Sequence, residues 1–447
     1  MKGRGDTKKT YAAYSLPAFI LSFAGLPLYV IAPDFYATEM NLSLGLIALL
    51  LLGVRAFDAV QDPLIGYFSD KFSAWRGIFF GAAFCLFVVG MLVLYIPMPS
   101  FAAYSFVAGT VFVATAFSII SINLNAIGSL ITQDTHAKTD ITAWREGFGV
   151  LGLLFAVLLP VLLGKWLDPR AAFATYALLF VLGVVFVSAT FMPWLKQQDF
   201  LFKQGRKSPT LSVVNAFSFL KSFQVRFFYL TYLVSIFASA LPAVLVLFFI
   251  RDVLGAEDAA GLFLLVYFLA GIAAIPVWRV CARHIGKERS WALSMMVAVA
   301  AFVWAGFLGA GDTLAYTFIC IISGAALGAE LILPPSILSD IIDKSETAAV
   351  TSSHFSLLAF LMKAAMAIAA VMSFGLLDQV RFQAAEANTT DALCMLSMLY
   401  AFIPCGLKLT SAVMIFCIYN YQQNGKKKNE TDCGLDGTGG KYHAEWM

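Results

Sequence analysis

Long apolar runs recur along the chain and are separated by short polar segments. Each run is close to the roughly 20 residues that an α-helix needs to cross a ~30 Å hydrocarbon core, and a helix satisfies its own backbone hydrogen bonds in lipid. In chain order, the runs predict membrane-spanning helices at residues 11–34, 44–68, 77–98, 103–131, 146–166, 171–194, 225–250, 259–281, 290–310, 314–339, 349–377 and 399–421. The pattern therefore predicts an all-α membrane protein with twelve transmembrane helices.

The overall composition agrees with this pattern. Of the 447 residues, 60% are hydrophobic and only 13% are charged, whereas a soluble domain carries about 25% charged residues. A water-soluble fold is therefore excluded. The charged residues 1–9 precede an apolar run that is too long for a signal peptide, so we expect the first span to stay in the mature protein.

Basic residues are distributed unevenly between the two sides of the predicted membrane. Only Lys165, Arg170, Arg251 and Arg381 fall on one side, whereas most of the 30 Lys and Arg residues fall on the other. The positive-inside rule places the basic side in the cytoplasm. We therefore expect a multi-pass protein of the cell inner membrane with both termini in the cytoplasm.

The longest polar interruption lies close to the middle of the chain and divides six spans from six. Within it, residues 210–222 space their apolar side chains like an interfacial amphipathic helix. We therefore expect an N-terminal six-helix bundle, a cytoplasmic linker with an amphipathic helix, a C-terminal six-helix bundle and a disordered cytoplasmic tail, at residues 1–194, 195–224, 225–421 and 422–447.

Ionisable residues in the second predicted span form one stripe. Asp62 lies four residues after Asp58, and Asp70 lies eight residues after Asp62, so the three carboxylates share one face of the helix. Arg55 lies three residues before Asp58 on the same face. Two carboxylates one turn apart offer oxygen ligands for Na⁺ or a shared proton site, and Arg55 would temper their negative charge. The alternative is a purely structural Arg–Asp network. Asp70 and Arg76, at the cytoplasmic end, are expected to form an ion pair that stabilises a gate.

Lys363 lies in the middle of the eleventh predicted span, inside the run FSLLAFLMKAAMAIAAVM. An unpaired ammonium group in the bilayer is costly, so we expect the chain to supply a counter-charge. Asp58 and Asp62 are the natural candidates, across the interface between the two halves. A fixed structural ion pair is the alternative interpretation.

The remaining charges near the predicted spans have less specific interpretations. Glu330 is buried by position, and Pro334-Pro335 just after it is expected to interrupt the helix. Asp340 falls at the cytoplasmic end, where a solvated or gating role is expected. Lys408 is expected to extend toward the membrane surface, and Trp291 to anchor a span end there.

Polar side chains also cluster in the fourth predicted span. Ser121, Asn123 and Asn125 lie there, but the two asparagines cannot share a helix face, so one lines a cavity or both hold helices together. Arg145, at the start of the fifth span, either reaches inward or meets lipid headgroups.

These residues resemble the glycoside–pentoside–hexuronide:cation symporters of the major facilitator superfamily. Both halves of the chain carry the resemblance. The N-terminal half has the second-span run from Arg55 to Asp70 and the segment ITQD (131–134) followed by Arg145. The C-terminal half has the segment PPSILSDIID and Lys363. It implies two six-helix bundles that give alternating access. It also implies binding of Na⁺, Li⁺ or H⁺ at Asp58 and Asp62 beside the substrate.

Three positions depart from the family pattern. Ser22 and Ser121 stand where the family has carboxylates, and Asn125 stands where it has an aromatic residue. Combining the resemblance with the residue pattern, we predict cation binding by Asp58, Asp62 and Ser121. Substrate binding is expected at Ser22, Asn125, Arg145 and Lys363. The coupling or gating residues are expected to be Arg55, Asp70, Arg76, Glu330 and Asp340.

The expected function is cation-coupled symport of a sugar or glycoside-like solute. Uptake or flipping of a lysophospholipid-like amphipathic solute is the alternative carrier function, and a non-transporting receptor or scaffold is a third. An enzyme is not expected, because the sequence shows no nucleophile–base set, metal motif or phosphate loop. The expected partners are the solute, a coupling Na⁺ or H⁺ and membrane lipid, with no cofactor, no further metal site and no nucleic acid.

Overall fold

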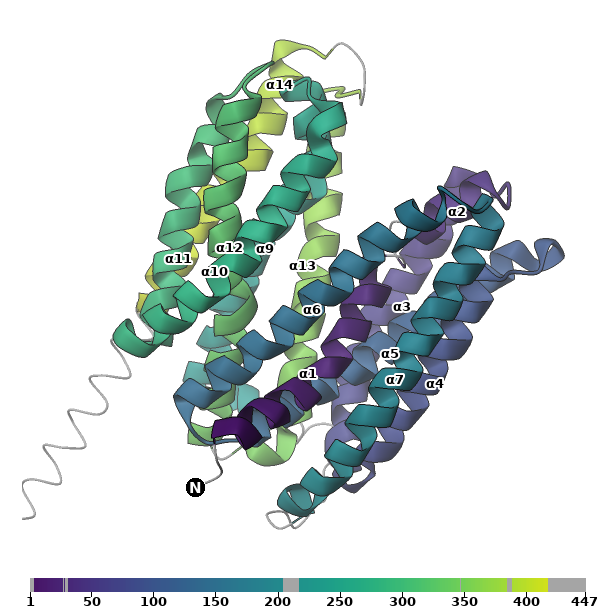
Figure 1. The fold of residues 1–447 in the computed structure, drawn as a ribbon. Helices are drawn as coiled ribbons and strands as arrows, with labels where there is room; N and C mark the ends of the chain where they lie inside the picture. Colours follow the sequence, from purple (N-terminus) through teal and green to yellow (C-terminus); the bar gives the residue numbers. More distant parts are fainter. Residues whose placement is uncertain are drawn as a thin grey trace, which may run out of the picture.

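The protein folds into two bundles of long helices (Figure 1). The computed structural model describes residues 4–26, 28, 31–203, 217–345, 347–383 and 388–416, and these residues contain no strand. The N-terminal bundle consists of α1 (Arg4–Leu26), the short α2 (Ala32–Thr38), α3 (Leu44–Lys71), α4 (Arg76–Tyr95), α5 (Ala102–Leu130), α6 (Thr135–Leu163) and α7 (Pro169–Lys203).

The C-terminal bundle repeats this arrangement. It consists of α9 (Phe223–Phe248), α10 (Ala260–Ile285), α11 (Lys287–Phe302), α12 (Thr313–Lys344), α13 (Thr351–Gln379) and α14 (Thr390–Ser397). The last helical run continues beyond α14 as far as Phe416. The predicted all-α architecture of two bundles is therefore confirmed.

Ten helical segments of the described chain are long and apolar enough to cross a membrane. The long helices outside this set are α1 and α3, and α3 carries the stripe of charges that the sequence analysis singled out. Both pack within the N-terminal bundle, α1 against α6 and α7, and α3 against α5. Twelve spans therefore describe the architecture approximately.

Two expected segments lie largely outside the described residues. The linker's amphipathic helix was predicted at 210–222, and only its end is described, where Ser218–Lys221 forms a short 3₁₀ turn. The predicted disordered tail at 422–447 lies wholly outside them.

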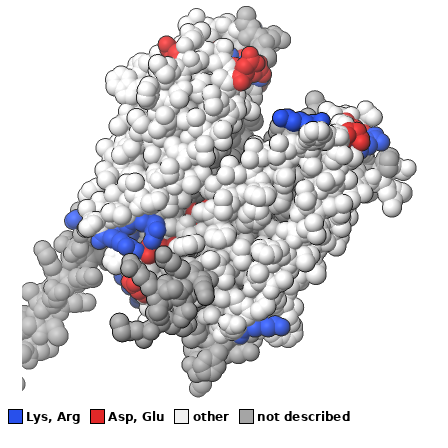
Figure 2. Space-filling view, viewed as in Figure 1, with Lys and Arg blue, Asp and Glu red and all other residues white. Residues whose placement is uncertain are grey.

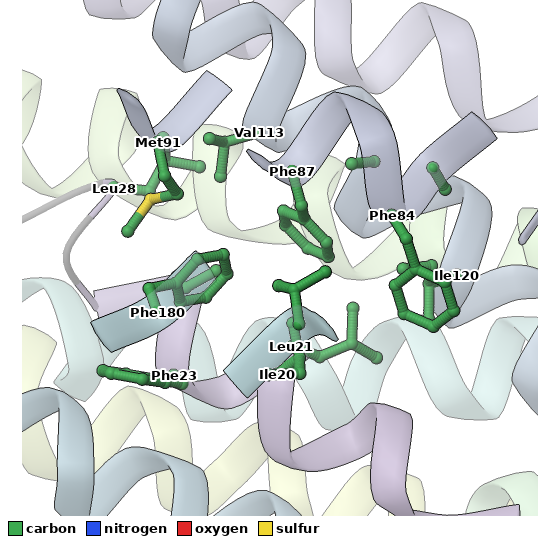
Figure 3. Packing of buried hydrophobic residues seen from close by; sticks show 14 of the residues in the cluster. Ile20, Leu21, Phe23, Leu28, Phe84, Phe87, Met91, Val113, Ile120 and Phe180 are labelled. Atoms are coloured by element: carbon green, nitrogen blue, oxygen red, sulfur yellow. The ribbon is translucent and has the colours of Figure 1, made fainter. Parts of the chain in front are cut away.

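The core of the N-terminal bundle is rich in aromatic rings (Figure 3). Phe23 of α1, Phe87 of α4 and Phe180 of α7 are fully buried and meet there. The ring centroids of Phe23 and Phe180 are 5.2 Å apart, and those of Phe87 and Phe180 are 5.7 Å apart. Edge-to-face and tilted contacts of this kind favour close packing of the helices that carry them.

The two bundles converge at the end of the molecule that holds the N-terminus and diverge toward the end that holds α2 and α14 (Figure 1). Helices α3 and α5 contact α13, and α6 contacts α10 and α12. Gly66 allows α3 to approach α13 closely, because a Cβ atom at this position would meet the Ser356 hydroxyl and lie 2.9 Å from the Ser352 carbonyl oxygen. Figure 2 shows the resulting hollow between the diverging ends.

The expected interruption of the helix at Pro334-Pro335 is wrong. Helix α12 runs continuously from Thr313 to Lys344 through both prolines. Its packing against α10 and α11 along its length explains why. Neighbouring helices and local adjustment compensate for the backbone hydrogen bonds that proline cannot make in a membrane-spanning helix.

Candidate functional site

The pair of carboxylates on α3 lies in the interface between the bundles. Asp58 and Asp62 are one helical turn apart, and they are 4% and 0% exposed, respectively. Both face α13 of the other bundle, which supplies Lys363. The Lys363 Nζ atom lies 2.8 Å from Asp58 Oδ1 and 2.8 Å from Asp62 Oδ2. The counter-charge expected for Lys363 is therefore present, and it is provided by both carboxylates together.

Polar side chains of the N-terminal bundle surround Asp58. The Gln61 amide donates a hydrogen bond to Asp58 Oδ1 at 2.7 Å, and the Ser118 hydroxyl donates to the same oxygen at 3.2 Å. Lys363 donates to Ser118 Oγ at 3.0 Å, and Thr115 donates to Gln61 Oε1 at 2.9 Å. The sequence analysis missed Gln61, Ser118 and Thr115.

The predicted hydroxyl ligand Ser121 lies one turn away from this cluster. Its described contact is made by its backbone carbonyl oxygen, which accepts a hydrogen bond from Asn125 at 2.8 Å. In the structure, Ser118 occupies the place beside Asp58 that the sequence analysis assigned to Ser121. The two serines lie three residues apart on α5, so spacing alone did not distinguish them.

Two carboxylates share one ammonium group at this site. Lys363 Nζ donates a hydrogen bond to Asp62 Oδ1 at 2.9 Å and also lies 2.8 Å from Asp62 Oδ2 and from Asp58 Oδ1. Two adjacent carboxylates in a buried site favour binding of a proton or a small cation. Arg55, one turn before Asp58, is exposed.

No cluster of three or more His, Cys, Asp and Glu side chains that could hold a metal ion occurs among the described residues. A Na⁺ ion at this site would therefore take its ligands from the two carboxylates and from neutral oxygens such as those of Ser118 and Gln61. Cations of this kind prefer oxygen ligands. The site has the donor chemistry for either a proton or a small hard cation.

Of the four residues expected to bind solute, Lys363 belongs to the charge cluster, and the other three lie elsewhere in the N-terminal bundle. Arg145 of α6 reaches inward, because it is buried and donates to Asn125 Oδ1 of α5. Glu146 accepts from the same guanidinium group at 2.6 Å and 3.0 Å. Ser22 of α1 packs against α6, where a Cβ atom at Gly149 would lie 3.0 Å from its hydroxyl. The structure thus brings Asn125 and Arg145 together and places Ser22 at a helix contact.

Asn123 has a structural position. It is fully buried and donates at 2.9 Å both to Ser69 Oγ on α3 and to the Ile119 carbonyl oxygen. Of the two asparagines in this span, Asn123 holds α5 to α3, whereas Asn125 binds the guanidinium group of Arg145. Asn123 therefore joins two helices, whereas a cavity-lining role for Asn125 stays a prediction.

Asp70 joins the two bundles at their converging end. Its carboxylate accepts hydrogen bonds from the backbone N–H groups of Ser352 and Ser353 at 2.8 Å and 2.7 Å, and from the Ser353 hydroxyl at 2.7 Å. These donors belong to the first turn of α13, where the helix dipole also favours a negative charge. Arg76 Nη2 lies 4.0 Å from Asp70. Asp70 therefore acts as an N-terminal cap for a helix of the other bundle.

A second group of charges joins α6 to α11 and α12 at the same end. Lys138 pairs with Asp343, lies 3.6 Å from Asp340 and donates to the Ser339 carbonyl oxygen at 2.9 Å. Lys287 lies 2.7 Å from Asp340. The predicted gating residue Asp340 thus sits between two buried lysines from opposite bundles.

A third contact at this end connects α6 with α10. Asp140 lies 2.7 Å from Arg279 and 2.5 Å from Arg283. Figure 2 shows basic and acidic side chains gathered where the bundles converge. The sequence analysis did not single out Lys138, Asp140, Arg279, Arg283 or Lys287, because at predicted span ends such charges resemble solvated loop residues. Their signal was the concentration of opposite charges at the ends of several spans.

Glu330 lies within the C-terminal bundle rather than between the bundles. Its carboxylate is 3.0 Å from Lys408 Nζ and accepts a hydrogen bond from Trp291 Nε1 at 3.0 Å. Ser235 Oγ donates to it at 3.1 Å and accepts from Lys408 at 2.8 Å. The expected extension of Lys408 to the membrane surface and the expected anchoring role of Trp291 are therefore wrong, because both side chains are buried and bind Glu330.

Two helical bundles joined by ion pairs at one end, with a buried charged site in their interface, define a membrane transporter of the two-bundle class. The chain belongs to the family described as MFS/sugar transport protein, whose sequence model matches residues 11–423. The protein is therefore a multi-pass membrane transporter rather than an enzyme.

Individual relatives agree with this assignment. A protein of Escherichia coli (strain K12) named "Putative glycoside/cation symporter YagG" is 24% identical over 215 residues, which cover 44% of this chain and 45% of that protein. The match thus spans about half the length of this curated relative.

Solved structures share the fold. A bacterial homologue of the iron transporter ferroportin, in an outward-facing state, superposes with a TM-score of 0.70 at 14% identity, covering 92% of this chain and 99% of that one. The E. coli fucose:proton symporter FucP superposes with a TM-score of 0.61 at 12% identity, covering 91% and 98%. The proton:xylose symporter XylE gives 0.61 at 12%, covering 92% and 95%. These similarities show the major facilitator superfamily fold.

Proposed function

We propose that this protein transports a sugar or glycoside together with a cation, by alternating access of one site to the two sides of the membrane. The observation that carries the proposal is the contact of Lys363 in one bundle with Asp58 and Asp62 in the other. A charge cluster that crosses the bundle interface can respond to cation binding and change the fit between the bundles. The glycoside/cation relative supports the solute class.

Lys363 is the internal counter-ion of the empty site in this mechanism. When a proton or Na⁺ binds Asp58 or Asp62, the negative charge of that carboxylate is neutralised and its attraction for the ammonium group weakens. The interface between α3 and α13 then loses part of its stabilisation. The protein alternates between an arrangement open to one side of the membrane and an arrangement open to the other. Solute and cation shift the population toward the arrangement that binds them more tightly, and the shift is set by the difference in affinity.

The charges at the converging end form a gate on the cytoplasmic face in this proposal. The excess of basic residues on that side supports its placement there, with both termini in the cytoplasm and the protein in a cell inner membrane. The arrangement described here is then outward-facing, since the bundles diverge at the other end (Figure 1). The capping of α13 by Asp70 and the Lys138 and Asp140 ion pairs would hold this state closed inside.

The partners in this proposal are a small polar solute, one coupling cation and membrane lipid. No cofactor and no nucleic acid is proposed. Uptake of a lysophospholipid-like solute is the alternative carrier function, and it requires a groove that admits an acyl chain from the lipid. A receptor or scaffold would not need Asp58, Asp62 and Lys363 in contact inside the membrane.

The test is transport by purified protein in proteoliposomes. Labelled methyl glycosides of common hexoses and pentoses are offered with an inward Na⁺ gradient, with an inward proton gradient, or with neither. We expect concentrative uptake with one gradient, and its loss in Asp58→Asn and Asp62→Asn. The exposed residue Asp258 provides the matched control, Asp258→Asn, which should transport like wild type. Equal uptake with and without a gradient, or unchanged coupling in both site variants, would contradict the proposal.

A further inference from the structure

The C-terminal bundle contains a cavity of about 220 Å³ between α9, α10, α11, α12 and the last helical run. Its walls are mainly apolar and aromatic, and they include Tyr267, Tyr316 and Tyr400. Phe263 meets Tyr316 edge-on, with ring centroids 4.9 Å apart and an interplanar angle of 89°. The two phenol groups of Tyr316 and Tyr400 hydrogen-bond each other at 2.6 Å. Because one of these hydroxyls donates to the other, the two phenol groups turn toward each other, and their rings contribute apolar surface to the wall.

One part of the cavity wall is polar. Glu330 and Lys408 both line the cavity, and their side chains pair at 3.0 Å. Their side chains remain slightly accessible, at 13% and 10%, respectively. The pair therefore offers a ligand one acceptor and one donor beside apolar walls. Small-molecule sites commonly combine mostly apolar walls with a few fixed polar groups.

The neighbours of the cavity place it beside the cleft between the bundles. Helices α10 and α12 on one side of it contact α6 of the N-terminal bundle. Helix α9 on the other side packs against α13, which contacts α3 and α5. Two helices of the cavity wall, α10 and α12, therefore face the N-terminal bundle, and a third, α9, is separated from it by α13. Ala243 of α9 and Phe268 of α10, which border it, are exposed.

We propose that this cavity binds the apolar aglycone of the solute, so that the transported substrate is a glycoside carrying a single aromatic ring or a short alkyl chain. This inference rests on the proposed function and specifies its substrate class. The cavity is smaller than the roughly 300–1,000 Å³ of pockets for drug-sized ligands. It accommodates a ring-sized group rather than a whole disaccharide.

The chemistry of the walls selects the same part of the solute. Sugar hydroxyl groups in this cavity would lose water with few partners in return, which is costly. An aromatic ring gains from burial and from edge-to-face contact with the tyrosines. The sugar ring therefore stays in the cleft between the bundles, and the Glu330–Lys408 pair meets a polar substituent on the aglycone.

The test compares methyl and phenyl glycosides of the same sugar. Counterflow into proteoliposomes is measured for each labelled pair of the glucose, galactose and xylose pyranosides. Burial of the ring predicts that the apparent affinity for a phenyl glycoside exceeds that for its methyl partner by on the order of tenfold. Transport of methyl glycosides without any phenyl preference would overturn this inference and leave the proposed function intact. Transport of neither kind would refute both.

Two variants locate the preference within the cavity. Ala298→Leu adds volume from α11, and Ser239→Leu adds volume from α9. Each should lower the ratio of phenyl to methyl affinity to near unity. The matched control is Val371→Phe on α13, where the native side chain is 76% exposed and outside the cavity; it should keep the wild-type ratio. A phenyl preference that survives in both filled variants, measured on monodisperse protein, would overturn the assignment.

Discussion

Two lysines contact carboxylates inside the membrane, and their surroundings differ. Lys408 is buried and pairs with the single carboxylate of Glu330 within the C-terminal bundle. Lys363, whose side chain is 20% exposed, crosses the bundle interface and meets two carboxylates, Asp58 and Asp62. A pair inside one bundle keeps its partners when the bundles move. A cluster that crosses the interface can change partners, so we propose that cation binding is coupled to movement there.

The largest expected effect tests the interface cluster. Asp62→Asn removes one of the two carboxylates that contact Lys363 across the interface. Gradient-driven accumulation should fall to the equilibrium level, because an amide neither takes up a proton nor supplies a negative charge for a cation. Accumulation of labelled glycoside is measured per mole of folded protein. Wild-type accumulation in this variant would mean that the contact of Lys363 with Asp62 is no more important for coupling than the contact of Lys408 with Glu330.

The second prediction concerns the pair inside the C-terminal bundle. Glu330→Gln leaves the buried Lys408 ammonium uncompensated, and removal of one partner of a buried pair costs about 3–5 kcal/mol. Thermal unfolding in detergent should therefore show a strong loss of stability.

The double variant Glu330→Gln with Lys408→Met provides the control. It removes both charges, so it should recover most of the lost stability and still accumulate a methyl glycoside, whose small aglycone does not need this pair, against a gradient. Loss of coupling in a stable double variant would show that the pair inside the bundle also takes part in coupling.

The third prediction concerns the gate. Asp70→Asn weakens charge-assisted hydrogen bonds to the first turn of α13, and each such bond contributes about 1.5–3 kcal/mol. The converging end should then open at least ~10-fold more often. The measurement is the rate at which an impermeant maleimide labels Ser339→Cys, a buried position at that end.

The matched control for the gate is Asp140→Asn. Its partners Arg279 and Arg283 are 30% and 47% exposed, and pairs of that kind contribute about 0.2–1 kcal/mol each. Labelling should therefore rise less than it does in Asp70→Asn. Equal effects of the two substitutions would mean that capping of α13 is not the dominant contact at the gate.

The sequence predicted the central contact because its physical requirements are local. Spacing of four residues puts Asp58 and Asp62 on one helix face, and the cost of a bare ammonium group in lipid requires a counter-charge for Lys363. Ser118 and Gln61 could not be found in this way. Hydroxyl and amide side chains are common between membrane helices, and no spacing distinguishes one that contacts a carboxylate from one that joins helices.

The ion pairs of Lys138 and Asp140 and the contact between Lys408 and Glu330 were missed for a different reason. Lys138 and Asp140 lie at a span end, where a charged side chain can reach water without cost, so the sequence gives no need for a partner. Lys408 lies in the last predicted span, from which a long side chain can extend to the membrane surface. In the structure it instead contacts Glu330, which lies 78 positions earlier in the sequence. Only the packing of distant helices determines which of these outcomes occurs.

The smallest expected effect is also the sharpest test of the comparison. Lys363→Ala is combined with Asp62→Asn and, separately, with Glu330→Gln, and cation affinity is measured for each single and double variant. Residues that share a charge network show coupling energies of about 0.5–3 kcal/mol, whereas distant residues add to within about 0.3–0.5 kcal/mol. Lys363 lies 2.8 Å from Asp62, so this pair should be non-additive. Glu330 is bound by Lys408 and Trp291 within its own bundle, so its combination with Lys363→Ala should be additive. Additivity for Lys363 with Asp62 would mean that the ammonium group and the cation do not compete for one carboxylate, and the change of partner could not then be the coupling step.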